Sequence, residues 1–154
     1  MKKVLNIIIL LICVITLTGC SQIGNKTMTC TRTDIDEDGF KSNKVMKVTY
    51  NSKRVIKVNA TNTVETTKDN IDEQIKFIEE YSKKFNSIGG LSMKVKKVND
   101  TNYKLIMSID YSRFNPEKIN KDLEGLDTDD NIITDKNYTI DDFKKDQLEG
   151  YDCK

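Results

Sequence analysis

The 154-residue chain contains no histidine, and this absence excludes several kinds of chemistry. Histidine is the usual general base of enzymes, the commonest zinc ligand and the side chain that changes charge near neutral pH. A serine nucleophile would then need a lysine partner, but no serine is followed by a lysine three positions later, as the Ser-x-x-Lys motif requires. We therefore expect the protein not to be an enzyme.

Cysteines are few, and none of the four stands in a Cys-x-x-Cys pair. Without such a pair and without histidine, the sequence gives little support for a zinc or redox site, and we expect no cofactor. Long apolar runs are also scarce, and the one that stands out extends from Val4 to Leu17. A transmembrane helix needs about 20 apolar residues, so this run is too short to span a bilayer.

The first twenty residues match an export signal instead. Lys2 and Lys3 precede the apolar run, as the charged region precedes the apolar region of a signal peptide. The run ends in Leu17-Thr18-Gly19-Cys20, which resembles the lipobox of bacterial lipoproteins. The resemblance implies that residues 1–19 are removed, that Cys20 carries diacylglycerol, and that the protein is held at the extracytoplasmic face of the cell membrane. The alternatives are an uncleaved anchor and an ordinary signal peptide with a chance cysteine.

The charge of the chain after the signal is balanced overall but unevenly distributed. Without Lys2 and Lys3, 23 basic residues stand against 24 acidic ones, a net charge of about −1. The stretch from Lys41 to Arg113 has a net charge of +7, and the stretch from Glu117 to Asp152 has −7. The balance gives no indication of nucleic acid as a partner, and the two stretches can simply attract each other within one fold.

Two cysteines remain after Cys20, and they stand near the two ends of the domain. These are Cys30 and Cys153. In an exported chain, which meets an oxidising environment, a disulfide between them is the simplest interpretation. The alternatives are two free thiols or a link to another molecule.

Strand patterns follow a short flexible tether at residues 20–27. Alternating apolar and polar residues predict an N-terminal strand and then two hairpins, with strands at 28–33, 44–50, 56–64, 91–95 and 103–109. In the second hairpin strand, Ile56 and Val58 are expected to point inward and Lys57 outward. The strands therefore belong to a mostly antiparallel sheet with one wet face.

Helix patterns lie between and after the hairpins. Apolar residues at helical spacing predict a helix over about 70–86, with Asp69 or Asn70 as the N-cap and Glu73 completing a capping box. A second helix is predicted from Asn115 to Gly125, residues 132–133 form a short strand or a buried link, and Thr139 caps a last helix. The order of the elements predicts a single α+β domain over residues 28–154, with the helices packed on one face of the sheet.

This layout resembles the YehR-like bacterial lipoproteins. The resemblance lies in the first hairpin, in Phe85-Asn86-Ser87-Ile88-Gly89-Gly90-Leu91, and in Ile109-Asp110-Tyr111 leading into Phe114-Asn115-Pro116-Glu117-Lys118-Ile119. It covers roughly residues 28–153. It implies a small lipid-anchored α+β domain whose function is not established, and it brings no catalytic motif.

A short acidic segment is a candidate calcium site. Asp34, Asp36 and Asp38, followed by Gly39, match the first half of an EF-hand loop. The bidentate glutamate that should end the loop is replaced by Val45, and no helix is expected on either side. An acidic surface turn is the simpler interpretation, and a weak extracellular calcium site is the alternative.

A set of lysines alternates with the apolar residues of the predicted strands, so we expect it on the sheet face opposite the core. The set contains Lys47, Lys57, Lys94, Lys96 and Lys104. A solvated face that resists aggregation is the simpler interpretation. The functional interpretation is a basic surface for anionic envelope polymers or lipid headgroups.

The residues together predict a non-enzymatic, lipid-anchored binding or interaction module at the membrane surface. Its expected partners are the membrane, through the anchor, and an anionic envelope polymer or a membrane protein. The alternative is a small-ligand-binding receptor that works with a membrane transporter, although a chain of one domain has no two-lobed cleft.

Overall fold

The computed structural model describes residues 24–113 and 138–154, which form a six-stranded antiparallel sheet and two helices. In chain order the elements are β1 (Lys26–Ile35), β2 (Lys41–Tyr50), β3 (Val55–Glu65), α2 (Ile71–Ser87), β4 (Leu91–Lys97), β5 (Asn102–Asp110), α4 (Ile140–Gln147) and β6 (Asp152–Cys153). The predicted α+β class is confirmed. The lipobox with Cys20 and the elements predicted at 115–125 and 132–133 lie outside the described residues.

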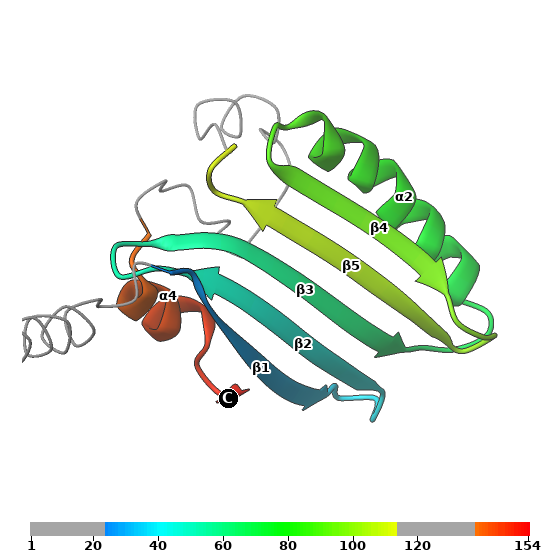
Figure 1. Cartoon of the computed structure of the whole chain (residues 1–154). Helices are drawn as coiled ribbons and strands as arrows, with labels where there is room; N and C mark the ends of the chain where they lie inside the picture. Colours follow the sequence, from blue (N-terminus) through cyan, green and yellow to red (C-terminus); the bar gives the residue numbers. More distant parts are fainter. Residues whose placement is uncertain (1–23, 114–137) are drawn as a thin grey trace, which may run out of the picture.

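The strands follow the order β4-β5-β3-β2-β1-β6 across the sheet (Figure 1). β1, β2 and β3 are consecutive antiparallel neighbours, and β4 forms a hairpin with β5. The group β1-β2-β3 precedes α2 in the sequence, and the hairpin β4-β5 follows it. The two groups are joined by the pairing of β3 with β5, which covers Lys57 to Glu65 of β3. β6 is short and pairs only with Cys30 and Thr31 of β1.

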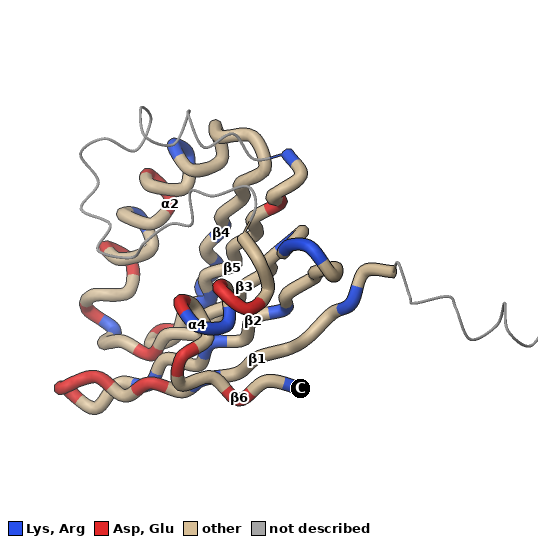
Figure 2. Tube along the Cα trace, turned by 90° about the vertical axis from the view of Figure 1, so that its left-hand side faces the viewer, with Lys and Arg blue, Asp and Glu red and all other residues tan. Residues whose placement is uncertain are grey.

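One face of the sheet carries the core because side chains along a strand point alternately to opposite faces. One row of cross-strand partners consists entirely of buried apolar residues, namely Met28, Val48, Val58, Ile109 and Leu91. α2 lies along β4 on this side of the strands (Figure 2). Its apolar stripe places Phe85 against this core, with Ile78 and Tyr81 partly buried beside it.

The start of α2 differs from the prediction. Asn70 is the N-cap residue, but its backbone is itself helical, with φ −97° and ψ −18°, and its side chain caps no backbone N–H. A capping box requires an extended N-cap residue whose side chain can turn back over the first turn of the helix. The predicted capping box between Asn70 and Glu73 is therefore wrong.

The end of α2 is bound directly to the next strand. The side-chain oxygen of Asn86 accepts a hydrogen bond from the backbone N–H of Met93 at 2.6 Å, and its amide nitrogen donates to the Met93 carbonyl at 3.0 Å. Ile88 then leaves the helix in an extended conformation, and Gly90 turns the chain with a φ of 90° that favours glycine. The chain therefore makes a tight turn at Gly89-Gly90 between α2 and β4.

The second helix is short but closes the other end of the core. The Thr139 hydroxyl accepts a hydrogen bond from the Asp142 backbone N–H at 3.2 Å, so the predicted cap is confirmed. Phe143 and Leu148, in and directly after α4, are buried in the same cluster as Met28. A segment of a few residues thus fills the part of the core that lies far from α2.

One predicted inward position is wrong. Val55 is fully buried, whereas Ile56 is only partly so. The register shifts between Thr49 and Tyr50, so that Lys57 lies opposite Thr49 and Val55 lies opposite Tyr50. Ile56 is the extra residue of a β-bulge, which a simple alternation cannot show.

The C-terminus returns to β1 and is closed there by the predicted disulfide. Cys30 and Cys153 face each other in the β1–β6 pair and are joined with an S–S distance of 2.08 Å. Thr29 and Lys154 exchange two backbone hydrogen bonds of 2.9 Å beside the bridge. The two ends of the described domain are therefore held side by side.

Candidate functional site

The sheet face turned away from α2 carries no helix of the described residues, and Figure 1 looks onto it. We call it the open face: the outward side chains of β1 to β5. One row across it consists of Thr29, Lys47, Asn59, Ser108 and Ser92. Apart from Lys47, the side chains in this row are short and polar, so the longer lysine side chains of the face extend beyond them.

Threonine is the commonest residue on the open face. All four outward positions in the middle of β1 are threonines, and β2 and β3 add three more; the set is Thr27, Thr29, Thr31, Thr33, Thr49, Thr61 and Thr63. The hydroxyl of Thr33 donates to the side-chain oxygen of Asn43 on the neighbouring strand at 2.9 Å. β-branched side chains suit a pleated surface, and their hydroxyls give it hydrogen-bonding capacity. We did not identify this array from the sequence, although the alternation at residues 27–33 shows it.

The five predicted lysines all occupy the open face, but the strand order separates them. Lys96 lies directly opposite Lys104, and Lys94 lies on the same strand two residues before Lys96. These three form a cluster on β4 and β5. Lys47 is on β2, opposite Asn59, and Lys57 is on β3, so these two lie apart from the cluster.

The open face carries more lysines than carboxylates, although one of the lysines, Lys57, lies directly opposite Asp110 on β5. Lys41 also points to this face, and together with the five predicted lysines it stands against two carboxylates, Glu65 and Asp110, for a net charge of +4. Both carboxylates lie at the ends of their strands. Within the described ranges, none of the five predicted lysines forms an ion pair. Like charges directly opposite each other, as in Lys96 and Lys104, are destabilising, and a bound anion would relieve this cost.

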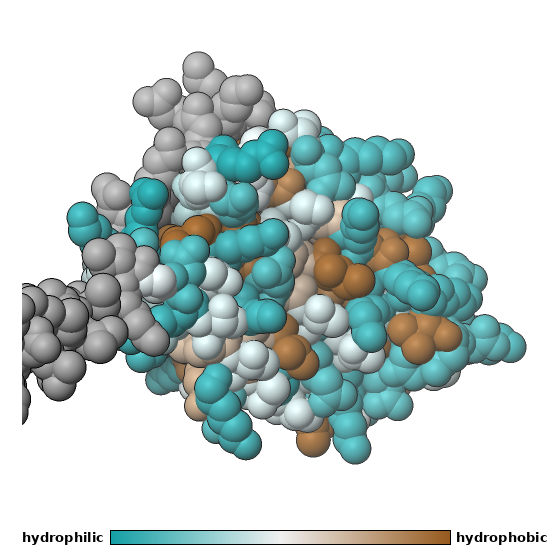
Figure 3. Space-filling model, viewed as in Figure 1, coloured by the Kyte–Doolittle hydropathy of each residue, from teal (hydrophilic) through white to brown (hydrophobic). Residues whose placement is uncertain are grey.

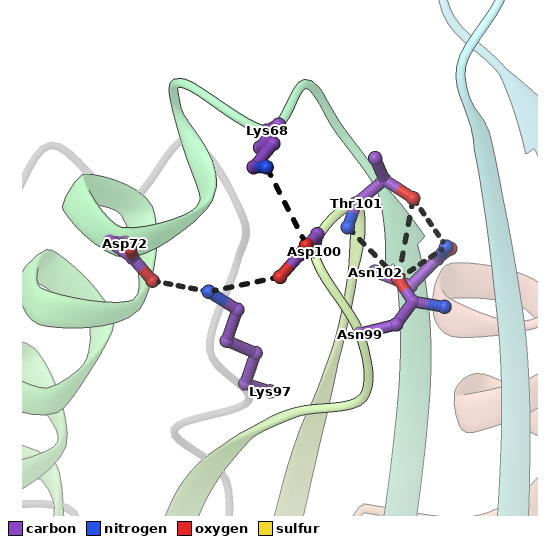
Figure 4. A network of polar contacts seen from close by, with 7 residues as sticks. All are labelled: Lys68, Asp72, Lys97, Asn99, Asp100, Thr101 and Asn102. Carbon is purple, nitrogen blue, oxygen red and sulfur yellow. Dashed lines mark hydrogen bonds and ion pairs between the residues drawn. The ribbon is translucent and has the colours of Figure 1, made fainter.

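Lysines at the neighbouring corner of the sheet are arranged differently (Figure 4). Lys97 is on the side of β4 that faces α2. Its Nζ atom lies 2.7 Å from Asp72 at the start of α2 and 4.0 Å from Asp100 in the β4–β5 turn. Lys68 lies 3.8 Å from the other oxygen of Asp100. The hydrogen bond to Asp72 raises the pKa of Lys97, so this lysine stays charged. These lysines connect the turn to α2, whereas the lysines of the open face are left to solvent or to a ligand.

Aliphatic side chains are interspersed with the lysines on the open face. Val45 and Ile106 are 43% and 41% exposed and flank Thr61 in one row that ends at Lys94. Ile35 and Val98 add exposed aliphatic surface at one end of the sheet. Figure 3 shows this face, with separate hydrophobic patches between hydrophilic ones. Val45 and Ile106 are separated from lysines on their own strands by an even number of residues, so the sequence already indicated that they share the lysine face. We did not predict them as part of the site.

Two of the three carboxylates of the candidate calcium site interact within the fold, namely that of Asp34 at the end of β1 and that of Asp36 in the turn after it. Asp34 lies 2.9 Å from Nζ of Lys44 and 2.5 Å from Nε of Arg32. Asp36 accepts a hydrogen bond from the backbone N–H of Phe40 at 2.8 Å. Among residues 24–113 and 138–154, no group of three or more acidic, cysteine or histidine side chains is placed to hold a metal ion. The structure therefore does not bring Asp34, Asp36 and Asp38 together as a set of calcium ligands.

We expect Asp34 to make the stability of the fold sensitive to acid. Its hydrogen bonds with Lys44 and with Arg32 lower its pKa below the ordinary value of 3.8. Because the pKa is lower in the folded state, this contribution is present above about pH 4 and is lost as the pH falls through the folded pKa. Asp34→Asn should therefore lower the urea midpoint at about pH 7 and have much less effect at about pH 2.

Asp38→Asn is the matched control for this measurement. It removes the same charge four residues later in the chain, and Asp38 forms no ion pair with another described residue. We expect an unchanged midpoint at both pH values. An Asp34→Asn effect of equal size at both pH values would contradict the ion-pair explanation.

Two helices are present in the described residues, and neither is long and apolar enough to cross a membrane. The positions of Cys20 and of the lipobox are not among the described residues. Any attachment to the membrane through Cys20 therefore stays a prediction from the sequence.

Two solved structures share the architecture of this chain. The NMR structure of the Escherichia coli YehR protein matches with a TM-score of 0.56 and 17% sequence identity, over 84% of this chain and 92% of that one. The NMR structure of a protein from Streptococcus pneumoniae TIGR4 matches with a TM-score of 0.56 and 15% identity, over 88% of both chains. Comparisons with protein-family models and with curated protein sequences gave no match. At this level of identity the similarity concerns the fold alone, and the chain has a YehR-like fold.

Proposed function

We propose that this protein is an exported, lipid-anchored, non-enzymatic module of the cell envelope that binds an anionic ligand through its open face. The observation that carries the proposal is the group of lysines that projects from a sheet face on which neither described helix lies, with carboxylates only at the strand ends. A flat basic surface with hydroxyl and amide groups between the charges suits an extended anionic surface or polymer.

The proposed location depends on the lipobox at residues 17–20 and on the disulfide. Disulfides form and persist in oxidising compartments, so the Cys30–Cys153 bridge supports export of the domain. In the proposal, diacylglycerol on Cys20 holds the chain at the extracytoplasmic face, because two acyl chains give firm anchoring. The absence of histidine and of a Ser-x-x-Lys motif supports a binding role over a catalytic one.

Charge reversal on the open face tests the proposal. We expect Lys57→Glu/Lys96→Glu to weaken binding to anionic liposomes or to polyglycerol phosphate at low salt by at least about tenfold, since each lysine near an anionic surface contributes about 1 kcal/mol. Binding can be measured by co-sedimentation or by calorimetry. Screening should reduce the difference between the variant and the unmodified protein as salt is raised.

Lys83→Glu/Lys84→Glu on α2 is the control for this pair. Both residues are exposed and lie on the helix that covers the other side of the sheet, so the same change in net charge occurs away from the open face. We expect this variant to bind nearly as well as the unmodified protein. Equal losses in the two variants would show that only net charge matters and would leave the open face as a solvated surface.

A further inference from the structure

We propose that the anionic ligand of the open face is the headgroup surface of the same membrane that holds the lipid anchor, so that the domain lies with this face on the bilayer. The inference rests on the proposed function, and it names the ligand that the proposed function leaves open. Three features of the structure support it.

The first feature is the mixture of basic and aliphatic side chains. Lys94 lies directly opposite Ile106, and the next pair on the same face of these two strands is Lys96 and Lys104. Ile106 and Val45 are exposed at the middle of the face. Surfaces that lie on membranes combine basic residues, which attract anionic lipids, with apolar side chains that enter the boundary between headgroups and acyl chains. A soluble polyanion would contact the ammonium groups and leave the aliphatic groups in water.

The second feature is the short distance along the chain between the anchor and the sheet. β1 begins at Lys26, six residues after Cys20, and six extended residues span at most about 20 Å. Thr27, the next residue, already belongs to the open face. Because the tether is short, contact of this face with the bilayer is intramolecular, with an effective concentration in the range of about millimolar. Even a weak electrostatic attraction is then enough to orient the domain.

The third feature excludes a second copy of the chain as the occupant. Two open faces stacked on each other would bring two surfaces of net charge +4 together. Buried like charges are strongly unfavourable in an interface. The charge therefore favours an anionic partner over a second copy of the chain, and the proposed anchor places an anionic surface within reach.

Acylation of lysines by a membrane-impermeant reagent tests the orientation. The mature protein is purified with its native N-terminus, including any lipid that the cell attaches. It is then reconstituted in vesicles of phosphatidylcholine or of phosphatidylglycerol at low salt. Mass spectrometry then gives the acylation rate of each lysine. We expect the lysines of the open face to react about threefold or more slowly on phosphatidylglycerol, with the difference lost at about 1 M salt. The exposed lysines of α2 serve as internal controls and should react equally on both, namely Lys76, Lys83 and Lys84.

A second arm separates this inference from the proposed function. Free polyglycerol phosphate is added to the protein in phosphatidylcholine vesicles. If the polymer slows acylation of the lysines of the open face and phosphatidylglycerol vesicles do not, the proposed function is kept and the membrane is overturned as the ligand. Protection by neither would overturn both.

Variants show whether the cluster on β4 and β5 produces the effect. Lys94→Glu/Lys96→Glu/Lys104→Glu should abolish the protection of Lys47 and Lys57 on phosphatidylglycerol, whereas Lys76→Glu/Lys83→Glu/Lys84→Glu should leave it unchanged. Because three glutamates on neighbouring strands can disturb the sheet, the corresponding triple glutamine variant is measured as well, with circular dichroism for both. Persistent protection in a folded glutamine variant would contradict the role of the cluster.

Discussion

Replacing Cys30 and Cys153 together by alanine is expected to lower the free energy of unfolding by about 5 kcal/mol, since the bridge closes a very long loop in the unfolded chain. The two residues are 123 positions apart, and chain entropy makes the gain larger for longer loops. Domains of this kind have a total stability of only about 5 to 15 kcal/mol. The variant should therefore unfold at a much lower denaturant concentration.

Alanine is the suitable replacement because Cys30 is fully buried, and a serine hydroxyl there would add a separate cost. Guanidinium unfolding of the double variant, compared with the unmodified protein in its oxidised and reduced forms, gives the measurement. The reduced protein and the variant should agree if the covalent link is the cause. A loss in the variant that far exceeds the loss on reduction would point to packing instead.

Other contacts of the C-terminal segment remain in this variant. The Nη1 atom of Arg32 donates to the carbonyl of Glu149 at 3.2 Å, and its guanidinium lies 5.8 Å from the centre of the Tyr151 ring. Phe143 stays in the core. We therefore expect the native form of the variant to keep the same sheet, with the loss of stability arising mainly from the unfolded state.

Phe85→Ala is expected to cost about 3 to 5 kcal/mol, because it removes a large side chain from a closed part of the core. Phe85 is 1% exposed and belongs to the cluster that includes Leu91 and Ile109. It also stacks against Tyr81, one turn earlier on the same helix, with ring centroids 6.2 Å apart. Denaturant unfolding measures the change, and a cost below about 1 kcal/mol would contradict the packing of α2 on the sheet.

Phe77→Ala on the same helix is the matched control. Phe77 is 68% exposed, so the same atoms are removed from a position that contributes little burial. Alanine also has the higher helix propensity, by a few tenths of a kcal/mol. We expect no loss, or a slight gain, in stability. The contrast between the two variants isolates burial from the identity of the residue.

The elements of the fold could be predicted where the pattern is local. The strands alternate cleanly because one face is buried and the other is exposed to solvent, and this period of two shows which side chains of a strand share a face. The apolar stripe predicted α2, and the hydroxyl of Thr139 was correctly predicted to cap α4. The errors at Asn70 and at Ile56 have a common origin, since the backbone conformation of an N-cap and the extra residue of a bulge leave no trace in hydrophobic periodicity.

The candidate site was predictable only in its composition. That five lysines share the open face follows from alternation alone. Their division into a cluster of three and two separate residues depends on the pairing of β3 with β5, which brings together strands separated by α2. The same pairing places Ile106 and Val45 in one row. The use of Asp34 by Arg32 and Lys44 likewise required the β1–β2 register.

The sequence by itself indicated the five long strands and the two described helices, showed which strand side chains point inward apart from Ile56, and placed two cysteines near the ends of the domain. These properties depend on neighbours a few residues apart, whose spacing is visible in the chain. The tertiary structure decided the strand order, the pairing of β6 with β1, and the surface on which lysine, threonine and aliphatic residues lie together. Such features arise from pairings between distant segments, where the burial of many side chains together selects one arrangement that no short stretch specifies.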